Sequence, residues 1–208
     1  MKKILIYSVG FTILLFGFRI IYSGTLLFFF IPWNLFLAWL PLLFSSKIKE
    51  QGINFRNSVF FVLWLLFFPN APYMITDLFH LEQRDGVPMY FDLILLFTAA
   101  WNALLMGLLS FRNIETWLLR MYSSSTVRII SAVCFFACGF GIYLGRYLRF
   151  NSWHVITQPF DLLKEIAVRF IHPFEHPGTW AVTVLFSVLM MIVYETLKQL
   201  PRYLNNKI

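Results

Sequence analysis

The sequence predicts an all-α, polytopic bundle of about six transmembrane helices that forms a single domain over residues 1–208, with both termini in the cytoplasm. Of the 208 residues, 59% are hydrophobic and 13% are charged, whereas a soluble domain has about 25% charged residues. Six apolar runs each approach the ~20 residues that cross a bilayer core. Lys and Arg concentrate in the segments that this topology leaves inside, as the positive-inside rule requires.

The predicted spans follow one another without a linker that would divide the chain; they cover roughly residues 4–22, 26–44, 57–73, 91–111, 129–148 and 179–197. The first begins like a signal peptide, because Lys2 and Lys3 precede it. It continues past Arg19 without an A-x-A-like cleavage site, so we expect an uncleaved span. The third is the shortest, because Pro69 and Pro72 interrupt its helical pattern.

Two long connections are predicted on the outer face of the membrane, over residues 74–90 and 149–178. Within the second, the pattern predicts a short amphipathic helix from Pro159 to Ile171, whose apolar residues recur near helical spacing: Phe160, Leu163, Ala167 and Phe170. Such a helix beside a span is expected to lie in the outer membrane interface, like a lid or cuff.

A polar cluster follows the proline break, at a depth where unpaired polar groups are costly; its members are Asn70, Tyr73, Thr76, Asp77 and His80. If a helix resumes after the break, Asp77 and His80 share a face, and the carboxylate can orient the ring and raise its basicity. We therefore expect Asp77 and His80 to be catalytic and Asn70, Tyr73 and Thr76 to bind substrate. The alternative is that Thr76 or Asp77 only caps a new helical turn.

A second polar cluster ends the fifth predicted span. Arg146 and Arg149 are spaced i and i+3 on its last turn, and Asn151 and His154 follow. Two guanidinium groups so placed suit a phosphate or carboxylate, so Arg146, Arg149 and Asn151 are predicted to bind substrate. His154 is predicted to be a catalytic acid or base. Two alternatives stay open, namely anchoring to lipid headgroups and an ion pair with Asp77.

Both clusters are predicted on the same side of the membrane, where they would form one pocket open to the outer leaflet. The favoured function is an enzyme that acts on a lipid or lipid-linked substrate. A transporter or flippase for an anionic or lipid-linked solute is the second possibility, because interrupted helices are typical of transporter sites. An accessory subunit without chemistry is the third. The Lys and Arg residues that give the net charge of +7 concentrate beside helix ends. Membrane lipids are therefore the expected partners, and nucleic acid is not.

Smaller features have simpler explanations. A pair of His80 and His154 with Asp77 or Asp161 matches no compact metal motif, so no metal is expected, and the sequence indicates no particular cofactor.

Other polar and small residues within the predicted spans are expected to serve packing. Asn34 and Asn102 are predicted to link helices by hydrogen bonds, and Asp92 to place a charge at a helix N-terminus. Gly141 and Gly145, with Gly139 nearby, predict close helix packing.

One motif resembles a known family. It consists of Phe68-Pro69-Asn70-Ala71-Pro72-Tyr73, followed by Thr76-Asp77-Leu78 and His80-Leu81. Together with Trp33 to Trp39 and the stretch from Tyr143 to Trp153, it resembles the bacterial membrane family catalogued as domain of unknown function 1361. The resemblance covers most of the chain. The resemblance implies a bacterial inner-membrane protein of several spans, and it implies no particular activity.

Overall fold

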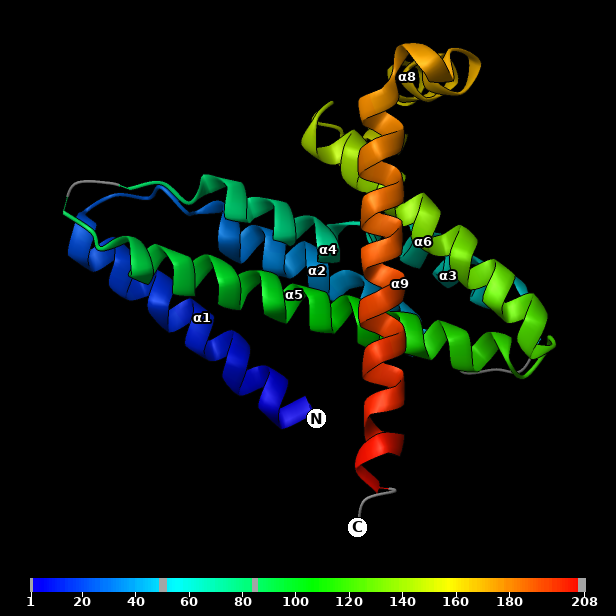
Figure 1. Cartoon of the computed structure of the whole chain (residues 1–208), viewed down its shortest axis with the longest axis horizontal. Coiled ribbons are helices and arrows are strands. Elements are labelled where there is room, and N and C mark those ends of the chain that lie inside the picture. Colours follow the sequence, from blue (N-terminus) through cyan, green and yellow to red (C-terminus); the bar gives the residue numbers. More distant parts are fainter. Residues whose placement is uncertain (1, 49–51, 84–85, 206–208) are drawn as a thin grey trace. The chain divides into compact units, whose positions relative to one another are not determined.

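The described part of the chain is entirely helical. A computed structural model describes residues 2–48, 52–83 and 86–205, which form nine α-helices and two 3-10 helices and contain no β-strand (Figure 1). By its internal contacts the chain divides into two compact units, unit 1 (Met1–Trp117) and unit 2 (Leu118–Ile208). That the two belong to a single domain stays a prediction.

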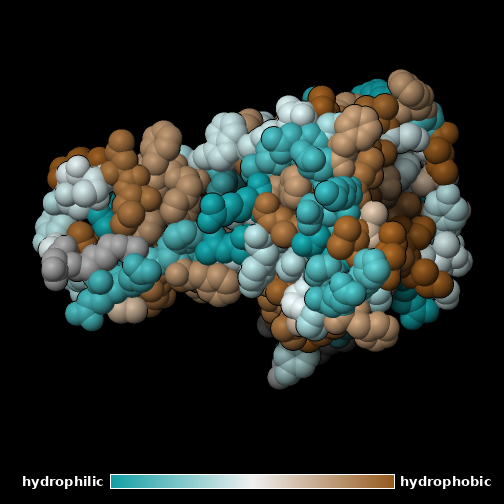
Figure 2. Space-filling view, turned by 90° about the horizontal axis from the view of Figure 1, so that it is seen from above, coloured by the Kyte–Doolittle hydropathy of each residue, from teal (hydrophilic) through white to brown (hydrophobic). Residues whose placement is uncertain are grey.

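Within the described residues, five helical segments are long and apolar enough to cross a membrane: Lys3–Ser23, Phe55–His80, Met89–Leu118, Ser124–Arg146 and Pro177–Pro201. The protein is therefore a multi-pass membrane protein. The remaining predicted span corresponds to α2 (Phe30–Lys47), an 18-residue helix that contains Pro41 and does not belong to this set. Six spans and the N-in orientation thus stay predictions. Apolar side chains cover much of the surface in Figure 2, as expected where lipid is the solvent.

Unit 1 is built around α5 (Met89–Leu118), beside which α1 (Lys2–Ser23) and α2 run in Figure 1. In the most apolar stretch of α5, 61% of the residues are buried, against 17% in α1, so α5 is the central helix and α1 a peripheral one. The buried core joins these helices through apolar side chains that include Phe16, Phe28, Ile31, Leu35, Ala38, Leu95, Leu96, Ala99 and Ala103.

The proline break changes the type of helix without opening a loop. Helix α3 (Phe55–Phe67) is followed at once by α4 (Asn70–Tyr73) and by the 3-10 helix η1 (Met74–His80). Because proline has no N–H to donate, carbonyl groups at the end of α3 need other donors. The side-chain amide of Asn70 supplies one and donates to the Phe67 carbonyl at 2.8 Å. The break therefore carries its own hydrogen-bond partner.

Unit 2 is built on an antiparallel pair, α6 (Ser124–Arg146) and α9 (Pro177–Asn205), joined through α7 (His154–Thr157), α8 (Pro159–Ile171) and the 3-10 helix η2 (Pro173–Glu175). The pair is closely packed at Gly139. A Cβ there would lie 2.3 Å from the Thr183 carbonyl oxygen, and the Ser187 hydroxyl donates to the Phe135 carbonyl at 3.1 Å. Small and hydroxyl residues so placed let two membrane helices approach and bond.

Helix α8 has the bounds predicted from the sequence, and it lies across the N-terminal end of α9 (Figure 1). Its predicted apolar stripe faces outward, since Phe160, Leu163 and Phe170 are 84%, 61% and 55% exposed. The opposite face buries Leu162 and Arg169. An apolar face turned away from the body of unit 2 is compatible with contact to lipid, although the place of α8 in the interface stays a prediction.

Gly139→Ala should destabilise the protein by about 2 kcal/mol or more, because the added methyl group collides with backbone and overpacking typically costs about 1–3 kcal/mol. The measurement is thermal unfolding of the full chain in detergent. Gly17→Ala in α1 is the matched control. No atom lies within 4 Å of its added Cβ, so it should gain about 0.5–1 kcal/mol. Equal unfolding temperatures for wild type and Gly139→Ala would contradict the close approach.

Candidate functional site

A buried ion pair joins α1 to α5 in unit 1. The Arg19 Nε donates to Asp92 Oδ1 at 2.9 Å, and Nη2 donates to Oδ2 at 3.4 Å. Both side chains are almost fully buried, with 4% and 1% of their surface exposed. Ionisable groups among apolar helices are expensive and usually mark function or a fixed helix contact.

Two further contacts fix the Arg19 guanidinium in place. Its Nη1 donates to the Thr25 hydroxyl at 3.3 Å, just beyond the end of α1. The chain turns there at Gly24, whose φ of 66° lies in the left-handed region that glycine adopts without strain. The ring of Phe28 lies 5.3 Å from the Arg19 guanidinium carbon and adds a cation–π contact. The guanidinium is thus held on three sides.

A pocket of about 420 Å³ opens beside this ion pair. It lies between the last turns of α1 and the start of α5, and its walls are mainly apolar and aromatic: Phe18, Arg19, Ile21, Tyr22, Val87, Pro88, Tyr90 and Phe91. A pocket of this size, with an apolar lining and few polar groups, is typical of a site for a small molecule or a lipid chain. Arg19 is the charged residue in its wall.

Asp77 and His80 lie on the 3-10 helix η1, where residues three apart are aligned. The Asp77 side chain is 3% exposed, and its Oδ2 accepts from the Asn34 side-chain amide at 3.0 Å. The expectation that Asn34 links helices is therefore confirmed, with Asp77 as its partner. The start of η1 has no side-chain cap, and the Thr76 hydroxyl donates to the Tyr73 carbonyl at 2.7 Å. The capping alternative is wrong.

His80 is half-buried, and its ring is oriented by the backbone. Nδ1 lies 3.2 Å from the Asp77 carbonyl oxygen. Because a carbonyl only accepts, Nδ1 carries the proton of the neutral ring and Nε2 carries the lone pair. The ring packs against Phe30, with centroids 5.0 Å apart, and Phe30 contacts Phe28 at 5.8 Å. The rings of His80, Phe30 and Phe28 therefore form a row, and the last of them contacts the Arg19 guanidinium.

The second predicted cluster lies in unit 2, at the end of α6. Arg146 is the last residue of α6, and Arg149 lies beyond it with a φ of 62°. The prediction that the two share the last turn is wrong, because this left-handed residue turns the chain back. Its reversal lets the Phe150 N–H donate to the Leu144 carbonyl at 3.0 Å. Arg149 is exposed and Arg146 is half-buried.

Asn151 and His154 are joined by a local hydrogen bond where α7 begins. The Asn151 N–H donates to His154 Nδ1 at 3.1 Å, so the neutral ring carries its proton on Nε2. The tautomer is opposite to that of His80. As neutral rings, His80 therefore offers a lone pair at Nε2, whereas His154 offers a proton there.

The structure groups the predicted site residues by unit. Asn70, Tyr73, Thr76, Asp77 and His80 lie together on α4 and η1 of unit 1. Arg146, Arg149, Asn151 and His154 follow one another in unit 2. That the two groups share one pocket stays a prediction. Among the residues that the structure describes, no group of three or more His, Cys, Asp or Glu is placed to hold a metal ion.

Sequence reasoning missed the pairing of Arg19 with Asp92. One available signal was that Arg19 interrupts an otherwise apolar span, and a charge there needs a partner. Asp92, at the start of another apolar run, was the complementary charge. Asn102 was assigned correctly, since it donates to Thr12 of α1 at 2.9 Å.

Comparison with known proteins identifies the family. A family model described as "Protein of unknown function (DUF1361)" matches residues 33–193, more than half of the chain. The chain belongs to this family. The resemblance carried by the motif around Pro69 and His80 is thereby confirmed, and the matched range includes both polar clusters. No curated protein and no solved structure matches the chain.

Asp92→Ala should lower the free energy of unfolding by about 3–5 kcal/mol, because it leaves the Arg19 guanidinium buried without its carboxylate. The measurement is unfolding of the full chain in mixed micelles. Replacing both partners, Arg19→Met with Asp92→Leu, should restore most of the loss. The exposed Arg112→Ala is the matched control on α5. Wild-type stability of Asp92→Ala would show that the pair holds nothing together.

Arg149→Gly should be at least as stable as wild type, because an L-residue in the left-handed region costs about 1–2 kcal/mol and glycine avoids this cost. Arg149→Ala keeps the strained backbone and should gain nothing. The measurement is the unfolding temperature of all three proteins. A clear loss of stability in Arg149→Gly would mean that the side chain, rather than the turn, is structurally required.

Proposed function

We propose that this protein is a bacterial inner-membrane enzyme that acts on a lipid or lipid-linked substrate drawn from the outer leaflet. The observation that carries the proposal is the pocket of about 420 Å³ between two helices able to span a membrane, with Arg19 in its wall. A pocket whose walls are apolar and that opens between two such helices is accessible to a lipid chain.

Substrate binding would use both properties of this pocket. Phe18, Ile21 and Phe91 offer apolar and aromatic surface to the chain of the substrate. Arg19 would meet the polar or anionic head of that substrate. Its charge is now balanced by Asp92, so an anionic group would compete with a carboxylate already in place. Such competition favours an anionic group that can accept two hydrogen bonds from the guanidinium at once, such as phosphate or carboxylate.

The chemical step is assigned to the histidines. His80, through the lone pair on Nε2, would take a proton from water or from the substrate, and Asp77 would position this segment through Asn34. His154, with its proton on Nε2, would act as an acid. Arg146, Arg149 and Asn151 would bind a phosphate or carboxylate of the substrate, and Asn70, Tyr73 and Thr76 would line the site near His80. These roles require the two clusters to face one pocket at the outer leaflet.

The test is lipid turnover by the full chain in liposomes. Phosphatidylglycerol, phosphatidylethanolamine and a polyprenyl diphosphate, each radiolabelled, are followed by thin-layer chromatography. His80→Ala should lower the rate about 100-fold or more, the usual contribution of a general base. His172→Ala is the matched control, because its side chain is 53% exposed beside Glu175. Wild-type rates in both His80→Ala and His154→Ala, or no turnover of any probe, would contradict the proposal.

A further inference from the structure

Among the described residues of unit 2, four buried side-chain polar atoms have no hydrogen-bond partner; one is Ser131 Oγ, and the other three lie within residues 169–179. These three are Arg169 Nε, His176 Nε2 and Thr179 Oγ1. Buried donors without a partner are rare in native proteins and indicate a ligand, an ion or water that completes them. This corner of unit 2, where α8 turns into α9, lies outside the residues to which the proposed chemistry was assigned.

Arg169 supplies the charge of this corner. It is 5% exposed and lies on the inner face of α8. Its Nη1 donates to the Glu165 carboxylate and to the Glu165 carbonyl, the latter at 2.7 Å. Burial alone would lower the pKa of Arg169, but hydrogen bonds to Tyr143 and Glu165 raise it above its ordinary value, so the guanidinium stays charged. The hydrogen bonds to Glu165 use Nη1, whereas the N–H of Nε donates to no acceptor.

Thr179 lies beside the same tyrosine by the register of α6 and α9. Gly139 lies opposite Thr183, and Phe135 opposite Ser187. One helical turn further along each antiparallel helix, this register pairs Tyr143 with Thr179. The Arg169 guanidinium carbon lies 5.6 Å from the centroid of the Tyr143 ring. The unused donors of Arg169 and Thr179 therefore flank one aromatic side chain.

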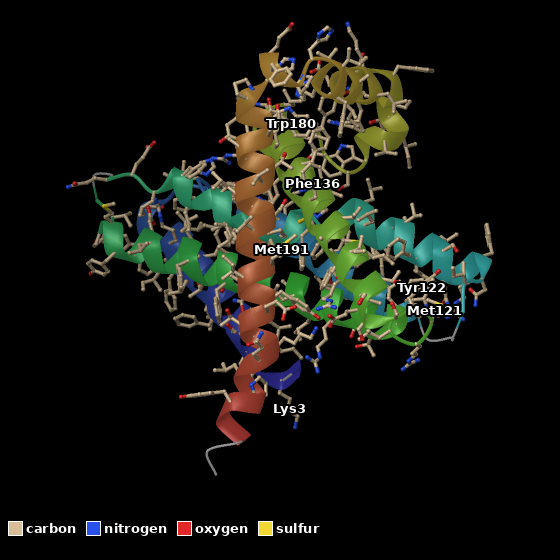
Figure 3. The ribbon with its side chains drawn as sticks, turned by 45° about the vertical axis from the view of Figure 1, so that its right-hand side comes forward. Lys3, Met121, Tyr122, Phe136, Trp180 and Met191 are labelled. Carbon is tan, nitrogen blue, oxygen red and sulfur yellow. The ribbon has the colours of Figure 1, made fainter. Side chains whose placement is uncertain are left out.

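Three aromatic rings close the neighbouring side of this corner. Phe140, Phe170 and Trp180 are in mutual contact, with centroids 5.1–6.1 Å apart. Figure 3 shows Trp180 on α9 near Phe136 of α6, whose ring is 6.3 Å away. This packing ties α8 to α6 and α9, although Phe170 also keeps 55% of its surface exposed. Buried donors beside such a wall interact more strongly with an anion than exposed donors do.

We propose that Arg169 Nε and Thr179 Oγ1, beside Tyr143, form a binding site for a phosphate or carboxylate group. An N–H and an O–H are both donors here, so the ligand must supply acceptor oxygens, and the positive guanidinium favours an anion. An anion could take the place of the Glu165 carboxylate beside Arg169, because the Glu165 side chain is 38% exposed and can turn outward. The anion is either the headgroup of a lipid or a free phosphate. The outward apolar stripe of α8, which includes Phe160 and Leu163, favours the headgroup.

The experiment measures anion binding by the full chain after delipidation in detergent. Phosphatidylglycerol, diacylglycerol and inorganic phosphate are titrated separately, and binding is followed by native mass spectrometry for the lipids and by ³¹P NMR for phosphate. Phosphatidylglycerol should bind, and diacylglycerol, which has no phosphate, should not. Arg169→Gln should weaken binding about 10- to 100-fold and Thr179→Val about 10-fold, the usual effect of losing one hydrogen bond to a charged group.

Two comparisons keep the proposal falsifiable. Thr179→Val preserves side-chain volume, so it tests the site even if Arg169→Gln fails to fold. Arg128→Gln removes an exposed charge of α6 and should bind like wild type. Binding of phosphatidylglycerol alone supports a headgroup site, and binding of inorganic phosphate as well supports a site for a free anion. No binding of either, equal binding of diacylglycerol, or wild-type affinity in Thr179→Val overturns the proposal. Lipid turnover by His80 can fail or succeed independently of these results.

Discussion

Polar side chains within the apolar helices of unit 1 need partners from the chain itself, because the hydrocarbon core offers no water. This constraint selects the helix contacts of unit 1. Arg19 reaches Asp92, Asn102 reaches Thr12, and Asn34 reaches Asp77. Apolar packing alone could not make these choices, since lipid tails are as apolar as the leucines that they would replace. Directional polar contacts therefore decide which helices are neighbours, and the apolar core fills the space between them.

Patterns local in the sequence predicted the parts of the fold that local physics decides. The bounds of α8 and the positions of the spans follow from apolar length and periodicity, and Asp77 lies near His80 because the two are only three positions apart in the sequence. Long-range pairs could not be read in this way. Arg19 and Asp92 are 73 residues apart; a charge within an apolar span signals that it needs a partner, but a single sequence does not say which residue that partner is. Arg149 was misplaced because a left-handed turn, rather than composition, ends α6.

Burial differs between the polar groups of unit 1 to which chemistry is assigned. Asp77 is 3% exposed and already accepts from Asn34, so its carboxylate is best suited to fixing η1 in place. His80 is half-buried, and its Nδ1 lies 3.2 Å from the Asp77 carbonyl oxygen. The backbone of Asp77 therefore contributes to the orientation of the His80 ring. Asp77 positions the peptide group whose carbonyl fixes the tautomer of His80.

Helix α8 reverses the usual arrangement of an amphipathic helix. Phe160 and Leu163 face outward, and the charged Arg169 faces the α6–α9 pair. In water this arrangement would be unfavourable on both faces, because it exposes apolar surface and buries a cation. In lipid the outward face becomes favourable, so the remaining cost is that of Arg169. Glu165 offsets part of this cost through one terminal nitrogen, and Nε still has no acceptor. An anion at this position would remove the last unfavourable contact of α8, so binding and the docking of the helix would stabilise each other.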